Sequence, residues 1–448
     1  MSAPIDAIYS LPNELLEAIA AAGQEERTQG YPFNTVTFKM EWALSHVSRR
    51  FRDVILGAPA LWTLLETDFG DEGSVEILKL YLERSEPQKV SADLRCRSTE
   101  SRRDLIVERV GLIVPHINRI WRLSIDVYTN SMELLIPFRD VAGPALRRLD
   151  IVNNHPGPWA PIEIFSAAAP ALTFLKMDGF KPLLPVPPWT ASLTHLEFWN
   201  GQDLGDESAT LLLTSITEQC PLLVHLYLDI NWMDSNGHRF HIPSLITLHI
   251  SISHSEDSDY LLGVVDLFDT PALTKLIINN ARCDQIQELF IATSLPHVSF
   301  PALTSLSLVN SGLCPCEDAV PFSDPLIFPK IFPALSSLTL VNQCFIPTLV
   351  GNVLGPTSQW PLKIITLCPQ NSFLDDVLAA VRDGIRLKRQ LGHTIPTLRF
   401  SPALFSLVPD DWDADGTEVR IFDPAQIITS LDRRARETLW SSRTEDIY

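Results

Sequence analysis

The sequence has 448 residues, 46% of them hydrophobic and 20% charged, which excludes a disordered chain and leaves room for more than one core or a long repeat array. The formal net charge of −19 argues against a nucleic-acid-binding protein, because the phosphate backbone would be repelled. Neutral or basic proteins are the partners that this charge suits.

No run of 18 apolar residues and no N-terminal signal is present, so neither a membrane span nor secretion is expected. The seven cysteines are scattered and odd in number, and there is no glycosylation sequon. This usage predicts a reduced, intracellular protein in the cytoplasm, the nucleus or both. Cys314 and Cys316 lie close together, but nothing nearby completes a zinc set, so no metal is expected.

Two helices are predicted in the first 56 residues, which we take as one small helical domain. The first runs from residue 5 to about residue 22, with Ser10 as a candidate N-cap and Gly23 as its stop. The second covers residues 41–56, where apolar residues recur at spacings of three and four. So short a unit buries little apolar area by itself.

These two segments resemble an F-box. Residues 10–19 read SLPNELLEAI and residues 43–55 read ALSHVSRRFRDVI, which match the opening and closing phrases of that family. Residues 57–69 look like the segment that follows the box in large fungal F-box families. The stretch between the two phrases, residues 20–42, is longer than in a compact F-box, which leaves the middle helix undefined.

The resemblance implies that the domain binds a Skp adaptor, and through it a cullin–RING ubiquitin ligase. The contacts that it carries over are Leu11, Pro12, Leu15, Leu16, Ile19, Leu44, Val47 and Phe51. An exposed apolar stripe on a small helical unit independently indicates a partner surface. The alternative is that these residues only form the core of the unit.

A bridge of helix and strand is predicted over residues 57–100. Val75, Leu78 and Leu82 share one helical face, and Glu86–Pro87 ends that helix. Residues 89–96 then alternate like a strand. Residues 103–114 are predicted to form another helix, followed by a strand from Ile120.

Nine copies of one phrase, Pro-x-Leu-x-x-Leu-x-Leu, occupy residues 144–367. The cleanest is PALTSLSL at residues 301–308, and successive copies begin 21 to 32 residues apart. The last two leucines point to the same face of a short strand, and the chain returns through a loop or a helix, as at residues 206–218 and 285–293. The predicted fold is therefore α/β: a divergent leucine-rich-repeat solenoid over residues 101–400, with ten or eleven repeats, a parallel inner sheet and outer helices. Asparagines that follow the strand in such repeats are Asn153, Asn279, Asn280, Asn310 and Asn342.

The residues between these leucines are expected to face outward on the inner wall. Those from the early repeats are charged or aromatic, which are the residue types that anchor interfaces. We predict that a target protein docks there, on Arg148, Phe174, Lys176, His195, Trp199, His225, Tyr227 and His249. The alternative is an ordinary polar sheet face.

Residues 401–448 are predicted to cap the array. Before them, a helix begins at Asn371 or Ser372 and is stopped by Gly392, and residues 397–400 form the last strand. A final amphipathic helix is expected from Asp423 to about Trp440.

Motifs for catalysis are missing. Asp411, Asp413 and Asp415 match the first half of a calcium loop, but Phe422 replaces the glutamate at its twelfth position. No hydrolase elbow, phosphate loop, dinucleotide fingerprint or metalloprotease motif occurs, so neither an enzyme nor a cofactor is expected.

The sequence therefore predicts the substrate-recognition subunit of a Skp–cullin–F-box ubiquitin ligase, a non-catalytic adaptor whose repeats hold an unknown target. A ligase-independent scaffold with a vestigial F-box is the first alternative. A hydrolase hidden in the repeats, which requires a deep polar pocket, is the second.

Overall fold

The structure is a computed structural model, and its described part comprises two compact units. One unit is Met1–Leu183 with Pro187–Leu193, and the other is Leu184–Val186 with Thr194–Tyr448. The described residues are 11–30, 39–68, 74–96, 107, 109–127, 135–153, 164–179, 188–199, 206–230, 239–252, 260–291, 300–310, 332–355, 360–408 and 418–422. The predictions for Ser10, the cysteine pair 314 and 316, the acidic loop 411–416, most of the helix 103–114 and the helix 423–440 lie outside these residues.

The first unit combines a helical segment with five parallel strands. Its helices are α2 Asn13–Gly30, α3 Met40–Ser45, α4 Arg49–Leu56 and α5 Ser74–Arg84, and its 3-10 turns are η1 Pro59–Trp62, η3 Val114–Arg119, η5 Ile136–Phe138 and η6 Pro188–Ser192. Its strands are β1 Leu64–Asp68, β2 Val90–Cys96, β3 Ile120–Val127, β4 Arg148–Asn153 and β5 Phe174–Asp178. They pair in chain order, each parallel to the next. Residues 57–100, expected as a bridge, thus supply two strands of the sheet.

The helix boundaries in this unit differ from the predicted ones at two small residues. Gly23 does not end the first helix, because α2 runs on to Gly30. A Cβ atom at Gly23 would lie 2.7 Å from Cε of Met40, so glycine serves here for close packing of α3. The predicted helix 41–56 is interrupted, because Ser48 takes extended backbone angles and its Oγ accepts a hydrogen bond from the backbone N–H of Phe51 at 3.2 Å. Ser48 is therefore an N-cap that starts α4 afresh.

The second unit contains nine parallel strands that follow one another in chain order. These are β6 His195–Trp199, β7 His225–Ile230, β9 Thr247–Ile252, β11 Lys275–Asn279, β12 Ser305–Val309, β13 Ser337–Val341, β14 Ile364–Cys368, β15 Thr397–Phe400 and β16 Val419–Ile421. Between them lie α7 Asp206–Gln219, α8 Tyr260–Asp266, α9 Cys283–Ile291, α11 Ile346–Val353, η7 Asn371–Phe373, α12 Leu374–Gln390 and α13 Pro402–Phe405. A separate parallel pair joins β8 Phe240–His241 to β10 Phe268–Asp269.

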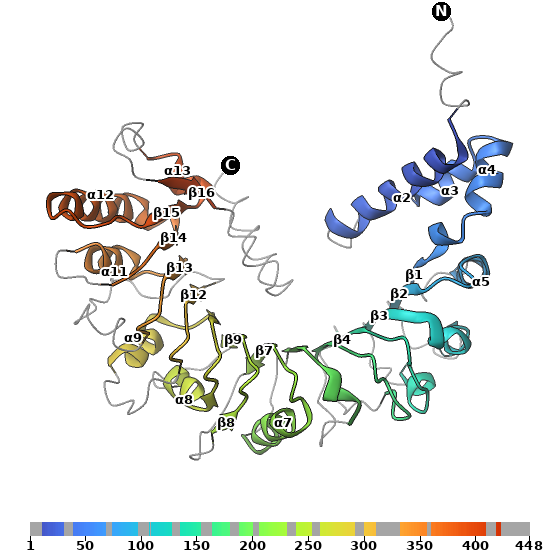
Figure 1. Cartoon of the computed structure of the whole chain (residues 1–448), viewed down its shortest axis with the longest axis horizontal. Helices are drawn as coiled ribbons and strands as arrows, with labels where there is room; N and C mark the ends of the chain where they lie inside the picture. Colours follow the sequence, from blue (N-terminus) through green and yellow to red (C-terminus); the bar gives the residue numbers. More distant parts are fainter. Residues whose placement is uncertain are drawn as a thin grey trace, which may run out of the picture. The chain divides into compact units, whose positions relative to one another are not determined.

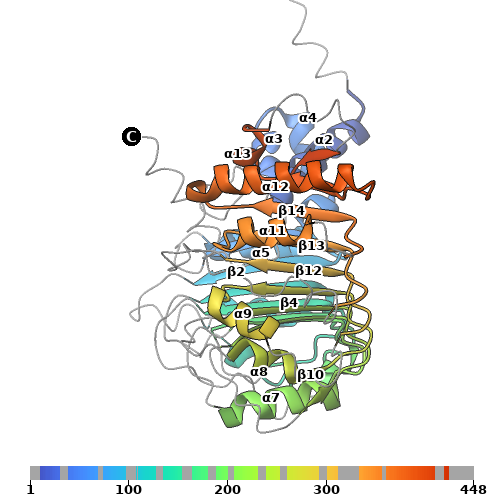
Figure 2. The same ribbon diagram turned by 90° about the vertical axis from the view of Figure 1, so that its left-hand side faces the viewer.

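The strands of the second unit are stacked like rungs, and its helices lie along one side of the sheet (Figures 1 and 2). The repeated leucines occupy identical register positions, as Leu276, Leu306 and Leu338 do in neighbouring strands. They point to the side of the helices and are at most 1% exposed. The predicted α/β architecture of a repeat solenoid, with a parallel sheet and outer helices, is confirmed. We call the side of each unit's sheet that lies opposite the buried leucines the helix-free face, because none of the described helices of the second unit lies on it.

All nine predicted phrases form strands, but the predicted number of repeats is too low. The described residues contain fourteen parallel strands, counting both units. The two that the sequence did not reveal are β1 and β16, which lack the full leucine phrase.

The predicted asparagines end several of the strands. Asn280 and Asn342 have positive φ angles of 59° and 54°, which asparagine tolerates better than most residues. Each donates its backbone N–H to a carbonyl of the next strand, Val309 O at 2.8 Å and Cys368 O at 2.8 Å. These asparagines thus turn the chain out of the sheet without leaving its first amide unpaired.

Candidate protein-interaction sites

The two phrases that resemble an F-box fold together into one helical unit. Arg50 of α4 donates to Asn13 Oδ1 of α2 through Nε at 3.3 Å and through a terminal nitrogen at 3.0 Å, and it also donates to the carbonyl of Leu11. Residues separated by more than 35 positions are thereby joined at the start of α2. The arginine holds the beginning of the first phrase against the end of the second.

The eight residues predicted to contact an adaptor divide into a buried and an exposed set. Leu16 and Phe51 are buried and form a small core with Val54, against which Leu11 and Leu44 pack. Leu15, Ile19 and Val47 are 49%, 48% and 48% exposed, and Pro12 is also exposed. Large apolar side chains that lie half in water on a small unit are available to a partner.

A buried carboxylate fixes the other side of this helical unit. Glu41 at the start of α3 is 1% exposed and accepts hydrogen bonds from Nε2 of Gln24 at 2.9 Å and from the hydroxyl of Tyr81 in α5. Nε2 of Gln24 also lies 2.7 Å from the carbonyl oxygen of Leu61. The ring of Tyr81 packs edge-on against Trp62, with 5.0 Å between the ring centres. These contacts attach α2 and α3 to the first turns of the repeat array.

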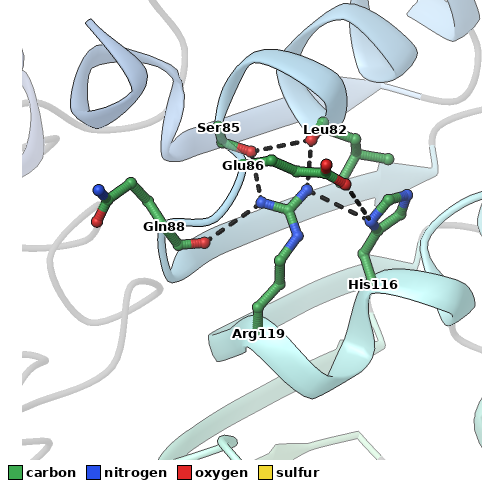
Figure 3. A network of polar contacts seen from close by, with 6 residues as sticks. All are labelled: Leu82, Ser85, Glu86, Gln88, His116 and Arg119. Carbon is green, nitrogen blue, oxygen red and sulfur yellow. Dashed lines mark hydrogen bonds and ion pairs between the residues drawn. The ribbon is translucent and has the colours of Figure 1, made fainter.

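A polar cluster lies at the end of α5 (Figure 3). Arg119, in η3, donates to Ser85 Oγ at 2.7 Å, to the carbonyl of Gln88 at 3.3 Å and to the carbonyl of Leu82. His116 Nδ1 lies 3.4 Å from the guanidinium and 3.9 Å from the Glu86 carboxylate. Burial, and then the charge of Arg119, lowers the pKa of His116 below its ordinary value. The cluster satisfies the terminal carbonyls of a helix, so we interpret it as structural.

On the helix-free face of the first unit, the predicted target-binding residues are half-buried. Arg148 lies over the ring of Phe174 at 3.8 Å and donates twice to Asp150, at 2.7 and 2.9 Å. Arg122 approaches the same carboxylate at 3.9 Å. Lys176 lies beside Asp150 in the register of β4 and β5. This part of the face is charged and open to solvent.

On the helix-free face of the second unit, the predicted residues form two groups of packed rings. Trp199 stacks on Tyr227 with ring centres 3.9 Å apart, and Tyr227 meets His249 edge-on at 4.3 Å. The rings of His195 and His225 stack with 4.2 Å between their centres, and His225 lies two residues before Tyr227 in β7. The sequence thus places all five rings on one face, as predicted.

The prediction that these side chains are exposed is wrong for three of them. Trp199, Tyr227 and His249 are 3%, 4% and 4% exposed, although they lie on the side of the sheet without helices. Burial, with a smaller contribution from Lys275, lowers the pKa of His249 to about 3. The same two causes lower the pKa of His225.

The buried strip continues beyond the predicted residues across the rest of the second unit. Ile277, Val309, Val341 and Cys368 form one apolar cluster with Trp199 and Tyr227, and Phe422 packs against it. Sequence reasoning missed this extension because small or neutral residues were taken as an ordinary exposed face. The available signal was the pair of consecutive apolar residues in these strands, as in Ile277-Ile278, Leu308-Val309 and Leu340-Val341.

Comparisons with known proteins give no family for the chain. No family model and no curated protein matches it. Among solved structures it is similar to a protein from Bacteroides fragilis, at 13% identity over 76% of each chain with a TM-score of 0.31. That likeness is too weak to carry an argument about function.

The described part of the chain contains neither a candidate membrane span nor a candidate metal-binding cluster. No helix in it is long and apolar enough to cross a membrane. It holds no group of three or more metal-ligating side chains.

Proposed function

We propose that the chain is the substrate-recognition subunit of a Skp–cullin–F-box ubiquitin ligase. Its helical unit binds the Skp adaptor, and its repeats hold the target protein. Ubiquitin transfer is carried out by the partner subunits, which the chain brings close to the target. Proximity of this kind raises the effective concentration of a target lysine without any catalytic residue in the receptor.

The observation that carries this proposal is the division of the F-box-like residues. A unit that folded only for its own stability would bury its large apolar side chains. Here Leu16 and Phe51 supply the core, while Leu15, Ile19 and Val47 remain about half exposed. Burying such side chains against a partner stabilises a complex by about 1 to 3 kcal/mol each.

The test is to place charges on the exposed side chains only. We expect the full chain with Leu15→Asp and Ile19→Asp to lose about tenfold to hundredfold in affinity for a purified Skp adaptor, because two interface side chains become charged. Isothermal titration calorimetry with the wild-type chain gives the reference affinity. Since both positions are exposed, the fold is expected to survive.

The matched control adds the same charge elsewhere on α2. Ala18 and Ala21 are exposed on the same helix, and Ala18→Asp with Ala21→Asp is expected to leave the affinity unchanged. If the wild-type chain shows no affinity for the adaptor, the F-box is vestigial and the chain is a ligase-independent scaffold. If the first variant binds like the wild type, the assigned surface is wrong.

The residues that favour target binding differ between the two units. Arg148, Phe174 and Lys176 of the first unit are half-buried, and arginine and aromatic residues are enriched in protein interfaces. In the second unit only His195 and His225 of the predicted set are partly accessible. We therefore propose that a target protein contacts these residues of the first unit.

A further inference from the structure

Two of the described cysteines lie against each other inside the second unit. Sγ of Cys283 and Sγ of Cys344 are 2.8 Å apart, although the two residues are 61 positions apart along the chain. They are 1% and 0% exposed, and neither is joined in a disulfide bond. The fold of the repeats therefore brings together two thiols that the sequence keeps far apart.

The two cysteines occupy similar places in alternate repeats. Cys283 is the first residue of α9, four residues after β11 ends at Asn279, and Cys344 lies three residues after β13 ends at Val341. The strands β11 and β13 are not neighbours, because β12 pairs with both of them. Strands two steps apart in a sheet are separated by about 9.6 Å, so the spacing of the strands does not by itself produce the contact between the sulfur atoms.

A matching backbone turn precedes each cysteine. Asn280, directly after β11, and Asn342, directly after β13, both have positive φ angles, of 59° and 54°. The N–H of Asn280 donates to Val309 O at 2.8 Å, and the N–H of Asn342 donates to Cys368 O at 2.8 Å. The two segments that carry the thiols are thus attached to the sheet by the same kind of hydrogen bond.

The residues next to the two thiols are also held by the fold. Oε1 of Gln285 accepts a hydrogen bond from the backbone N–H of Arg282 at 3.0 Å, which satisfies a donor at the start of α9. Ile286 in α9 and Phe345 beside Cys344 are fully buried. Both thiols therefore project from packed backbone, which keeps them in contact.

The distance between the sulfur atoms is short enough for a bond to form without unfolding. A disulfide bond is about 2.05 Å long, so the two atoms need to approach by less than about 1 Å. Small changes of the side-chain torsions of Cys283 and Cys344 supply a movement of this size. The pair is therefore poised for oxidation within the folded second unit.

We infer that Cys283 and Cys344 are a reversible disulfide site, closed by hydrogen peroxide and reopened by a small thiol. The thiolate of one cysteine attacks an oxygen atom of the peroxide, the O–O bond breaks, and a sulfenic acid and water result. The second thiol attacks the sulfur of the sulfenic acid, so that the S–S bond forms and a second water leaves. Two thiols and one peroxide thus give one disulfide and two molecules of water. Two molecules of glutathione reverse the step by exchange and become glutathione disulfide.

A reversible bond agrees with the cysteine usage of the chain. Disulfides are rare in reducing compartments, and those that occur there are usually transient or redox-sensing. The bond closes a loop of the chain that contains β12 and joins the ends of β11 and β13. Because such a link restricts the unfolded chain, the oxidised second unit is expected to resist denaturation better than the reduced one.

The experiment treats the purified full chain with hydrogen peroxide and then alkylates the remaining thiols. Mass spectrometry of unreduced peptides is expected to find Cys283 linked to Cys344, and the link is expected to disappear after incubation with glutathione. Linkage of either cysteine to Cys314 or Cys316 in its place would overturn the inference.

The matched control is a third buried cysteine of the second unit. Cys220 is 1% exposed, and Cys220→Ser is expected to leave the link unchanged, whereas Cys283→Ser and Cys344→Ser are each expected to abolish it. Oxidation is expected to raise the urea midpoint of the second unit by about 1 M in the wild type and in Cys220→Ser. An equal rise in Cys283→Ser would show that a different oxidation is responsible.

A second measurement removes the effect of burial on the rate of reaction. The full chain is unfolded in urea and refolded in a buffer of reduced and oxidised glutathione, so that every thiol meets the oxidant before it is buried. The link between Cys283 and Cys344 is again expected, and its absence after refolding would contradict the inference. Neither measurement involves the Skp adaptor, so the outcome is independent of the proposed ligase function.

Discussion

His249 is an ionisable residue whose neutral form is favoured by burial inside the protein. Its ring is 4% exposed, it meets Tyr227 edge-on, and its Nε2 has no hydrogen-bond partner among the described residues. Protonation would bury an uncompensated cation next to Lys275, which is why burial and that lysine together lower the pKa of His249 to about 3. The residue therefore links the stability of the second unit to pH.

We expect the free energy of unfolding to fall below pH 6.5 because of His249. The unfolded chain takes up a proton near the ordinary pKa of 6.5, whereas the folded chain does so only near 3. This stability is complete above pH 6.5 and is lost progressively as the pH falls toward 3. At pH 5 the loss is about 2 kcal/mol, from 1.5 pH units at about 1.36 kcal/mol each.

The measurement is urea unfolding of the wild type and of His249→Gln at about pH 7 and about pH 5. Glutamine does not titrate, so the decrease between the two pH values is expected to be smaller in the variant by about 2 kcal/mol. Comparing the two decreases removes the contribution of every other titrating group. Equal decreases in both proteins would show that His249 is not buried in solution.

At the scale of elements, the junction between α5 and η3 depends on one side chain. The guanidinium of Arg119 contacts three groups of the segment that ends α5: the carbonyls of Leu82 and Gln88 and the hydroxyl of Ser85 (Figure 3). Ser85 also donates to the Leu82 carbonyl at 3.2 Å. Three acceptors at and just after the end of α5 are satisfied by one donor from η3, which fixes the two elements together.

We expect Arg119→Ala to lower the free energy of unfolding of the first unit by about 2 kcal/mol, since buried acceptors lose a charged donor. Arg119→Lys is expected to recover less than half of this loss, because a single ammonium group cannot reproduce the planar fork of donors. Chemical denaturation measures both values. Lys79→Ala, at an exposed position of α5, is the control and is expected to change stability little. Full recovery by lysine would contradict the proposed geometry.

At the scale of the whole molecule, each unit contains its own series of buried leucines at matching register positions of neighbouring strands. Each leucine packs on the same position of the strands before and after it, as Leu338 does between Leu306 and Ile365. In such arrays each repeat is stabilised mainly by its neighbours. A cavity in one strand is therefore expected to weaken its own surroundings first.

We expect Leu338→Ala, at a position 1% exposed in β13, to cost about 2 to 5 kcal/mol and to raise amide hydrogen exchange mainly in the second unit. Leu123→Ala, at a fully buried position of β3, is the matched substitution in the first unit and is expected to give the opposite pattern. Mass spectrometry of exchanged peptides distinguishes the two. Equal acceleration throughout the chain in both variants would indicate that the units unfold together.

Much of the fold followed from local sequence patterns, because the repeated phrase encodes strand direction by itself. Two leucines at i and i+2 lie on one face of a strand, so PALTSLSL predicts β12 without knowledge of any neighbour. The strand β2 and the end of α12 just before Gly392 were predicted in the same way, but the predicted start of α12 at Asn371 or Ser372 is wrong, because its N-cap is Phe373. The misplaced boundary at Gly23 depends instead on a contact with Met40, which no single helix pattern contains, whereas Ser48 is a local N-cap that the prediction of one helix over residues 41–56 overlooked.

The sequence by itself determined twelve of the fourteen described strands of the long sheet and which of their sides faces the helices, because both depend on the period of two along a strand. It also determined which residues resemble an F-box. Only the tertiary structure decided which of those residues are exposed, since burial of Leu16 and exposure of Leu15 depend on where α4 packs. Likewise, alternation put Trp199, Tyr227 and His249 on the helix-free face, but only the tertiary structure shows that these three side chains are buried there.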